Sequence, residues 1–234
     1  MSPALRPVPS IAARERRLAR LLEQHELGPE DAGLARLVDD AQLLGSLELA
    51  GLRFTWDEVR ASGATGEGPA AVLALRRAQA AVARDAPLTV PAVRAWHEAL
   101  AGPVGFRTGE RRREGGAPPA PADRIEERLA GLVDWIEVAG TRDLAPDQAA
   151  AVALARLLEI LPFDEANGRV SRLAASHLMV RGGMRPPILV AGDAPRLRAA
   201  VESAFRMETG PLVELLSEAS GRALDVLIQS LGGR

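Results

Sequence analysis

Apolar residues recur at spacings of three and four through most of the chain, which is the pattern of amphipathic helices. The pattern predicts helices over residues 11–27, 31–49, 70–84, 91–100, 122–138, 146–160 and 169–181. Pro146 at the start of one segment and Gly182 after the end of another agree with the usual signals for helix ends. Because no alternating apolar and polar run indicates a strand, the sequence predicts an all-α fold, a helical bundle.

Two stretches interrupt the helical pattern. Residues 102–121 are rich in glycine and proline and have a charged centre that runs from Glu110 through Arg111, Arg112 and Arg113 to Glu114. Such composition predicts a short flap, either a hairpin or a loop. Residues 62–69 predict a second, shorter loop. We expect an N-terminal helical region over 1–85 and a core domain over 86–234, which together fold as one cooperative unit.

Composition narrows the possible partners. The chain is 47% hydrophobic and 26% charged, and its net charge is -2. It contains no cysteine, and all 29 basic residues are arginine. Disulfides and thiolate chemistry are therefore excluded, and no basic stripe interleaved with aromatic residues indicates nucleic-acid binding. No run of uncharged residues is long enough for a membrane span, and the first thirty residues do not resemble a secretory leader, so we expect a cytoplasmic protein.

Most of the candidate ligand-binding residues lie between residues 161 and 172. Asn167 and Gly168 open a predicted helix, and Arg169 and Arg172 follow three residues apart on one face of it. The positive end of a helix and two guanidinium groups together suit an oligophosphate. Glu165 lies just before the helix and could supply one carboxylate to a phosphate-bound Mg²⁺. An ordinary helix cap with two solvated arginines would give the same pattern, so spacing alone leaves both interpretations open.

This segment resembles the signature of the Fic family, HPFx[D/E]GNGRxxR. It keeps seven of the signature residues: Pro162, Phe163, Glu165, Asn167, Gly168, Arg169 and Arg172. It replaces the leading histidine with Leu161 and the first glycine with Ala166. A second segment, residues 88–108 (LTVPAVRAWHEALAGPVGFRT), is similar to the family's helix and the start of its flap, with flap residues Gly105, Phe106, Arg107 and Thr108.

The resemblance implies ATP or another nucleotide and Mg²⁺ as cofactors, transfer of AMP to a protein hydroxyl, and docking of the target protein at the flap. By the same resemblance Glu165 would be the metal acid, and the nucleotide binders would be Asn167, Gly168, Arg169 and Arg172. Leu161 stands at the position of the catalytic base and cannot accept a proton, a loss that typically costs about 10²- to 10⁴-fold in rate. Asp164 beside it is a possible surrogate base.

Further departures from the family lie outside the signature loop. Many Fic proteins carry an inhibitory helix with the motif [S/T]xxxE[G/N], whose glutamate pairs with the second signature arginine. Here Ser46 and Gly51 match the motif, but Ala50 replaces the glutamate, so we expect Arg172 to be unpaired. We also expect that the Cβ of Ala166 penalises the backbone conformation at that position. We take His97 to be a buried, hydrogen-bonded structural residue.

Three hypotheses follow. The leading one is a degenerate Fic-domain protein, a pseudoenzyme that binds a nucleotide or nucleotide-linked ligand and lacks normal AMPylation. The second is an active transferase of the same fold that moves another phosphate-linked or sugar group without the signature histidine. The third is a structural or regulatory partner of another protein.

Overall fold

The computed structural model describes residues 10–29, 31–111, 118–140 and 143–232, and within these ranges it contains helices and no strand. The all-α prediction is confirmed. The helices are α1 (Ile11–Gln24), α2 (Ala32–Glu48), α3 (Trp56–Thr65), α4 (Ala70–Ala80), α5 (Val90–Ala101), α6 (Ile125–Trp135), α8 (Pro146–Ile160), α9 (Asn167–Arg181), α10 (Ala194–Phe205) and α11 (Gly210–Gly232). Short 3₁₀ turns precede α6 and α10, and a π-helical turn follows α6.

The prediction of a loop over residues 62–69 is partly wrong, because α3 continues to Thr65. A capping box starts this helix: the Thr55 hydroxyl accepts from the Glu58 N–H at 3.2 Å, and the Glu58 carboxylate accepts from the Thr55 N–H at 2.7 Å. Gly66 ends it with a left-handed φ of 74°. The periodicity also missed α10 and α11, although α11 buries leucines along much of its length.

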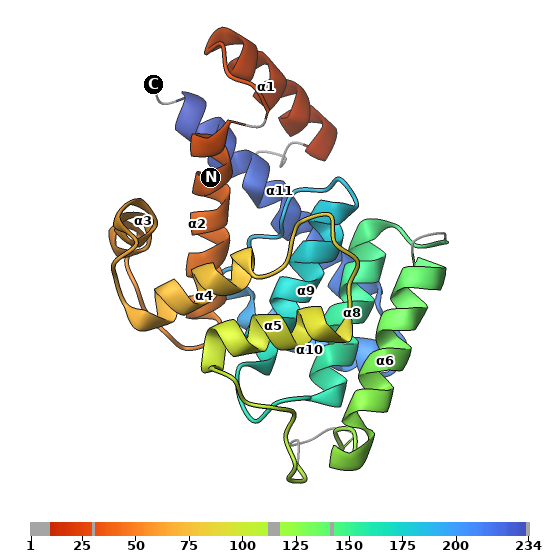
Figure 1. Cartoon of the computed structure of the whole chain (residues 1–234). Helices are drawn as coiled ribbons and strands as arrows, with labels where there is room; N and C mark the ends of the chain where they lie inside the picture. The colour runs from red at the N-terminus through yellow and green to blue at the C-terminus, as the bar shows by residue number, and fades with distance from the viewer. Residues whose placement is uncertain (1–9, 30, 112–117, 141–142, 233–234) are drawn as a thin grey trace, which may run out of the picture.

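The central elements are α8 and α9, which pack against each other along their length as a helical hairpin. In Figure 1, α5 and α6 lie on the near side of this pair, α10 and α11 lie behind it, and α2 to α4 lie beside it. One large hydrophobic core joins all these elements, from Leu43 on α2 to Ala219 on α11. None of the helices in the described ranges is both long and apolar enough to span a membrane.

A second, smaller hydrophobic cluster attaches α1 to α2 and to the C-terminal half of α11 at one end of the molecule. Leu18 and Leu22 of α1 meet Leu34 and Val38 of α2 in this cluster. Figure 1 shows α1 standing apart from the body, with α11 running out to meet it. The chain therefore has one main core with a helical extension.

Helix α2 lies in direct contact with the chain segment that follows α9. A Cβ added at Gly45 would lie 1.8 Å from the carbonyl oxygen of Leu189 and 3.0 Å from its carbonyl carbon. Both neighbouring atoms belong to backbone, so a side chain at position 45 could be accommodated only if the helix moved away from the segment. The absence of a side chain here sets how closely α2 approaches the core.

We predict that Gly45→Ala lowers the free energy of unfolding by more than about 2 kcal/mol, because the new methyl group meets backbone atoms. Helix propensity alone predicts the opposite sign, a gain of roughly 1 kcal/mol for alanine over glycine within a helix. Gly131→Ala on α6 is the matched control, because a Cβ there meets nothing within 4 Å. Urea denaturation of both variants measures the difference, and equal stabilisation of the two would contradict the packing argument.

Candidate functional site

The loop of residues 161–166 joins α8 to α9, and a residue with left-handed backbone stands at each end of it. Leu161 has a φ of 51° and ends α8, where its N–H donates to the Leu157 carbonyl oxygen at 3.0 Å. Ala166 has a φ of 60° and comes directly before α9. For residues with a Cβ, this conformation costs roughly 1–2 kcal/mol. The expected conformational penalty at Ala166 is therefore present.

Helix α9 starts without a side-chain cap. In contrast, the Asp31 side chain accepts from the Leu34 N–H at the start of α2, and the Thr89 side chain accepts from the Ala92 N–H at the start of α5. The first N–H to bond back within the helix belongs to Val170, which donates to the Ala166 carbonyl oxygen at 3.0 Å. The N–H groups of the three preceding residues, 167–169, therefore point out of the helix end. This end carries the partial positive charge of the helix dipole.

The side chain of Asn167 holds the loop rather than facing solvent. Its Nδ2 donates to the Phe163 carbonyl oxygen at 2.7 Å, and its Oδ1 accepts from the Phe163 N–H at 3.0 Å. The residue is buried, and both polar atoms of its side chain are engaged in this way. Asn167 can therefore offer a ligand its backbone N–H, while its side chain fixes the shape of the loop.

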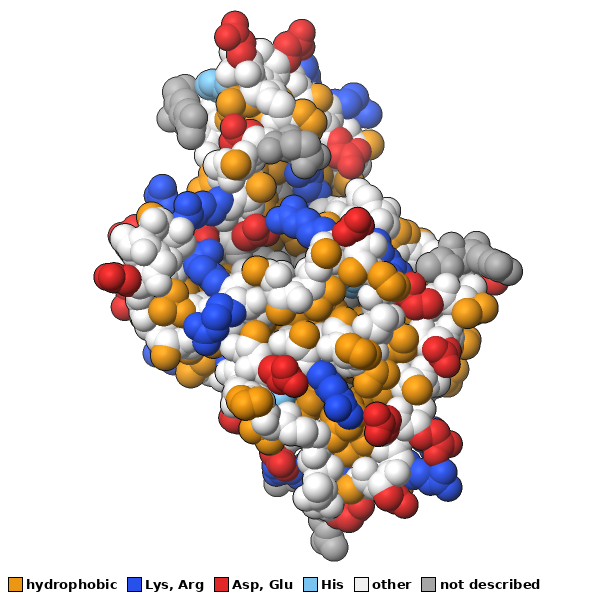
Figure 2. Space-filling view, in the orientation of Figure 1, with side chains coloured by type: hydrophobic (Ala, Val, Ile, Leu, Met, Phe, Trp, Pro, Cys, Tyr) orange, Lys and Arg blue, Asp and Glu red, His pale blue; other side chains and the backbone are white. Residues whose placement is uncertain are grey.

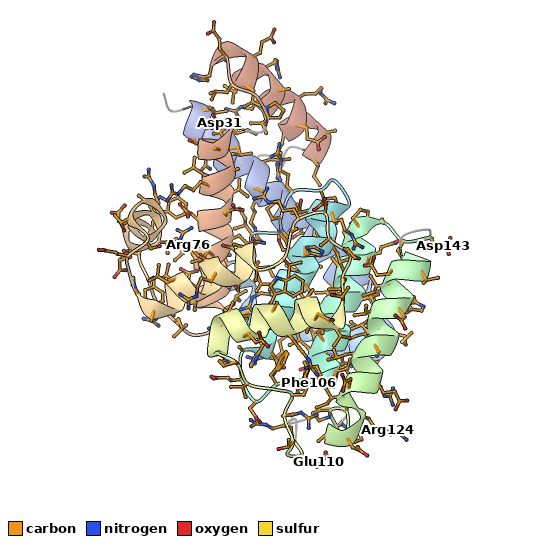
Figure 3. The ribbon with its side chains drawn as sticks, in the orientation of Figure 1. Asp31, Arg76, Phe106, Glu110, Arg124 and Asp143 are labelled. Atoms are coloured by element: carbon orange, nitrogen blue, oxygen red, sulfur yellow. The ribbon has the colours of Figure 1, made fainter. Side chains whose placement is uncertain are left out.

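Phe163 anchors the loop to the core, as expected, and is 1% exposed. Its ring stacks on His97 of α5 with centroids 3.8 Å apart and planes 6° apart. On the flap, Phe106 contacts the same ring at 5.5 Å, and the Arg94 guanidinium lies 4.2 Å from the Phe106 centroid. Figure 3 shows Phe106 in this position below α5. The stack joins α5, the flap and the loop.

His97 is buried as expected. It is 2% exposed, and the hydrogen bond of its ring is a marginal one, to the backbone of Val104. Burial lowers the pKa of His97, the charge of Glu165 opposes that effect, and the charge of Arg169 adds to it. A neutral imidazole stacked on Phe163 fits this environment.

Arg107 fastens the flap to the loop. Its guanidinium is 2% exposed and donates only to carbonyl oxygens: Leu161 at 2.7 Å, Gly109 at 2.8 Å, Ile160 at 3.3 Å, and Ala120. Its backbone N–H also donates to the Pro162 carbonyl oxygen at 3.0 Å. Sequence analysis assigned Arg107 only to the flap and missed this role. The other predicted flap residues, Gly105 and Thr108, are exposed.

A second contact joins flap and loop at the surface. Arg111 Nη2 lies 2.9 Å from both the carbonyl oxygen and Oδ1 of Asp164. The carboxylate proposed as a surrogate base is therefore occupied by a cation, in a pair that is about half exposed and worth at most about 1 kcal/mol. The remaining charged residues of the flap centre, Arg112, Arg113 and Glu114, lie outside the described residues.

Arg172 has no carboxylate partner in the described ranges, but it is hydrogen-bonded to α2 through contacts that sequence analysis did not predict. Its Nε donates to the Ser46 hydroxyl at 3.0 Å, and its Nη2 donates to the Ser46 carbonyl oxygen at 2.8 Å. Ser46 comes from α2, the helix whose sequence resembles the inhibitory motif, while Ala50 is exposed in the turn after it. Both partners, a hydroxyl and a backbone carbonyl, are neutral. Burial, together with Arg169, lowers the pKa of Arg172 to about 10.

Gly168 and Leu154 complete the surroundings of Arg172. A Cβ at Gly168 would lie 3.2 Å from Nη1 of Arg172, so the missing side chain leaves room for the guanidinium. On the other side, a cavity of about 20 Å³ is lined by Ser46, Leu154 and Arg172 among others. That volume is enough for about one water molecule. The guanidinium therefore lies between the open end of α9 and a small internal space.

Glu165 is exposed on the loop, and it is the predicted metal ligand. In the described part of the chain, no group of three or more histidine, aspartate or glutamate side chains is arranged to hold a metal ion. A single carboxylate fits Mg²⁺ only when phosphate and water supply the other ligands. The residues present therefore suit a cation that arrives with a phosphate ligand.

Comparison with known proteins agrees with this arrangement. Residues 87–179 match the model of the Fic/DOC family. The chain is 26% identical to the protein adenylyltransferase Fic of Drosophila willistoni over 162 residues, which are 67% of this chain and 32% of that protein. It is 28% identical over 113 residues to the protein adenylyltransferase fic-1 of Caenorhabditis briggsae, covering 48% of this chain and 22% of the relative. The chain thus spans a third or less of the length of these relatives.

Solved structures share the fold. A Fic domain containing signaling protein from Bacteroides thetaiotaomicron superposes with a TM-score of 0.77 at 19% identity, covering 96% of this chain and 98% of that one. Fic-1 from C. elegans superposes with a TM-score of 0.72 at 19% identity, covering 95% of this chain and 74% of that one. The helical extension is therefore part of an arrangement that other chains adopt.

We predict that Ala166→Gly raises the free energy of unfolding by about 1 kcal/mol, because glycine adopts a φ of 60° without a Cβ penalty. Ala199→Gly is the matched control, since Ala199 is exposed within α10, where the same change should cost about 0.5–1 kcal/mol. Chemical denaturation of both variants measures the two shifts. The strain argument fails if Ala166→Gly destabilises the protein as much as Ala199→Gly does.

Proposed function

We propose that this chain is a degenerate Fic-domain protein that binds a nucleotide or a nucleotide-linked ligand and lacks normal protein AMPylation. The match of residues 87–179 to the Fic/DOC family model supports this proposal. Its relatives are named protein adenylyltransferases, so ATP is the first ligand to test. The open end of α9, with Gly168, Arg169 and Arg172, is the proposed phosphate site. Glu165 would hold a Mg²⁺ ion that also binds the phosphates.

The observation that carries the binding proposal is the neutral pairing of Arg172. A largely buried guanidinium that meets only a hydroxyl and a carbonyl is costly, and Arg169 nearby raises the cost. An anion at the end of α9 would offset both charges and would also accept from the free N–H groups of the helix. Phosphate groups combine the required charge with several acceptor oxygens.

The loss of transfer activity follows from the absence of a suitable base. The side chain of Leu161 cannot accept a proton, and the Asp164 carboxylate is paired with Arg111. His97 is buried beneath Phe163, and His177 lies about 12 Å further along α9 than Arg169. If a target protein binds, the exposed part of the flap around Gly105 and Thr108 is the proposed docking surface.

We predict that at least one of ATP, ADP, GTP, CDP-choline and a nucleotide sugar, with Mg²⁺, raises the melting temperature of the full chain. A ligand at 100 times its Kd should add about 2.7 kcal/mol of stability. Arg172→Ala should abolish this gain because it removes the central cation of the site. Isothermal titration calorimetry with the same ligand then gives the Kd.

Two controls separate the phosphate site from general effects on stability. Ser46→Ala removes the partner of Arg172 but keeps the cation, so it should bind the ligand at least as well as the unmodified chain. Arg128→Ala changes an exposed arginine on α6 and should bind normally. The binding proposal fails if no ligand in the panel binds, or if Arg172→Ala binds as well as Arg128→Ala does. Transfer of a sugar or other group by the unmodified chain would favour the altered-chemistry alternative.

We predict that Leu161→His combined with Ala166→Gly restores incorporation of labelled AMP from ATP into protein. The expected gain is about 10²- to 10⁴-fold over the unmodified chain, the usual contribution of a general base. Adding Arg172→Ala to the double variant should remove the gain, because the phosphates would lose their cation. Equal incorporation by the double variant and the unmodified chain would mean that more than the base has been lost.

A further inference from the structure

Helices α2 and α9 are joined by two polar contacts that lie one helical turn apart on both helices. Gln42 Nε2 donates to the Ser176 hydroxyl at 2.6 Å, and Arg172 donates to the Ser46 hydroxyl and carbonyl oxygens at 3.0 and 2.8 Å. On each helix the two contacting residues are four positions apart and therefore share one face. Because the order of the contacts is reversed between the helices, α2 and α9 run in opposite directions where they meet.

The amide of Gln42 is held in place from a third helix. Gln79 of α4 donates its Nε2 to Gln42 Oε1 at 3.2 Å, which leaves Gln42 Nε2 to donate to Ser176. Ser176 is 8% exposed, so its hydroxyl is largely withdrawn from water. Loss of that hydroxyl would leave the Gln42 amide without its acceptor, and an unmatched donor of this kind opposes the present position of α2.

The remaining contacts around Arg172 do not fix how far α2 lies along α9. The internal cavity of about 20 Å³ beside Arg172 is lined mainly by apolar side chains, among them Leu43, Leu75, Leu154, Leu173 and Leu216. Apolar contacts have no directional preference. The contact at Gly45 sets how closely α2 approaches its neighbour, but glycine has no side chain that could select one register. The register therefore depends on the polar contacts.

Gln42 also lies between this cavity and the surface. Gln42 and Gln79 line both the internal cavity and a larger cleft, and Figure 2 shows the surface hollowed below the α1 extension. A shorter side chain at position 42 would connect the two spaces. A side chain of similar size without an amide removes the hydrogen bond and keeps the spaces apart, so Gln42→Leu is the informative substitution.

The position of α2 determines how Arg172 is presented. Two of its nitrogens are engaged by Ser46, and Nη1 lies beside Gly168 at the open end of α9, where a Cβ would come within 3.2 Å of it. One of the two acceptors on Ser46 is a backbone carbonyl. A shift of α2 along α9 would move this carbonyl and turn the guanidinium with it.

We propose that Gln42 and Ser176 are positioning residues for the anion site at the start of α9. Their contact fixes α2 along α9, so that Ser46 holds two nitrogens of Arg172 while Nη1 faces the helix start. The inference takes its ligand from the proposed function, but the position of Arg172 is measurable without a ligand. Loss of the Ser46 hydroxyl removes one acceptor and leaves the carbonyl in place, whereas loss of the Ser176 hydroxyl releases the helix.

Nuclear magnetic resonance of the full chain with isotopically labelled arginine follows the Nε–H proton of Arg172, whose signal is assigned by its loss in Arg172→Lys. We expect exchange of this proton with water to be at least about tenfold faster in Ser176→Ala than in the unmodified chain, because the proton is exposed whenever α2 moves away. Gln42→Leu should have the same effect. Circular dichroism first checks that each variant keeps its helical content.

Ser220→Ala is the matched control. Ser220 is 6% exposed on α11, and its hydroxyl donates to the Arg185 carbonyl oxygen at 2.8 Å, so this variant also loses one buried serine hydrogen bond. It should leave exchange at Arg172 unchanged. A role in stability alone would affect Ser176→Ala and Ser220→Ala equally.

Calorimetric titration with ATP and Mg²⁺ then measures the effect on the site. Ser176→Ala should bind ATP roughly fivefold more weakly or worse, because a displaced guanidinium is no longer preorganised for the anion. Ser46→Ala should bind at least as well as the unmodified chain, and Ser220→Ala should bind normally.

The inference is overturned if the Arg172 proton exchanges at the same rate in Ser176→Ala and Ser220→Ala. It is also overturned if ATP binds the unmodified chain and Ser176→Ala equally well. Faster exchange in Ser176→Ala without ATP binding to the unmodified chain would contradict nucleotide binding with ATP and support the positioning of Arg172 by Gln42 and Ser176.

Discussion

Arg107 brings a positive charge into the interior at a place where the described residues offer it no carboxylate. Backbone carbonyl oxygens of the α8 terminus, the loop and the flap accept the hydrogen bonds of its guanidinium. The carbonyl end of α8 carries partial negative charge, so the helix itself compensates the guanidinium. Because the same side chain holds Leu161, Gly109 and Ala120, it fixes the flap relative to the loop. The position of the proposed site depends on this contact.

The second signature arginine is held differently. Arg172 lies near the N-terminus of α9, which carries the partial positive charge of the helix dipole. The helix therefore destabilises the guanidinium instead of compensating its charge. Its partners on α2 are a hydroxyl and a carbonyl, where an inhibitory glutamate would have supplied a full negative charge. Helix α2 therefore still positions the guanidinium but does not neutralise it. The same contact keeps α2 close to α9, in agreement with the absence of a side chain at Gly45.

Much of this arrangement could be predicted from the sequence, and the remainder has identifiable causes. Periodicity gave α8 its bounds because Pro146 and the apolar spacing agree, but it missed α3, whose start depends on the reciprocal Thr55 and Glu58 contact. The positive φ at Ala166 was expected because the related motif has glycine there.

The pairings that complete the site were not predictable. Arg111 and Asp164 are 53 positions apart, and Arg172 and Ser46 are 126 positions apart, and local spacing contains no information about such contacts. Nor could the sequence reveal that both polar atoms of the Asn167 side chain are hydrogen-bonded to the Phe163 backbone. The residue types were predictable from the motif, whereas their partners are set by the packing of distant helices.

The substitutions in this chain share one direction. Compared with the motifs that the sequence resembles, Leu161 stands in place of a histidine and Ala50 in place of a glutamate, yet Arg169 and Arg172 remain. Neither substitution removes a cation, and the one at Ala50 removes the carboxylate that the resemblance would place beside Arg172. A site without function would be stabilised by losing one arginine as well, since burying like charges together is unfavourable. The retained pair lies at an uncapped helix start directly after the left-handed Ala166, and the proposed anion would compensate both of its charges.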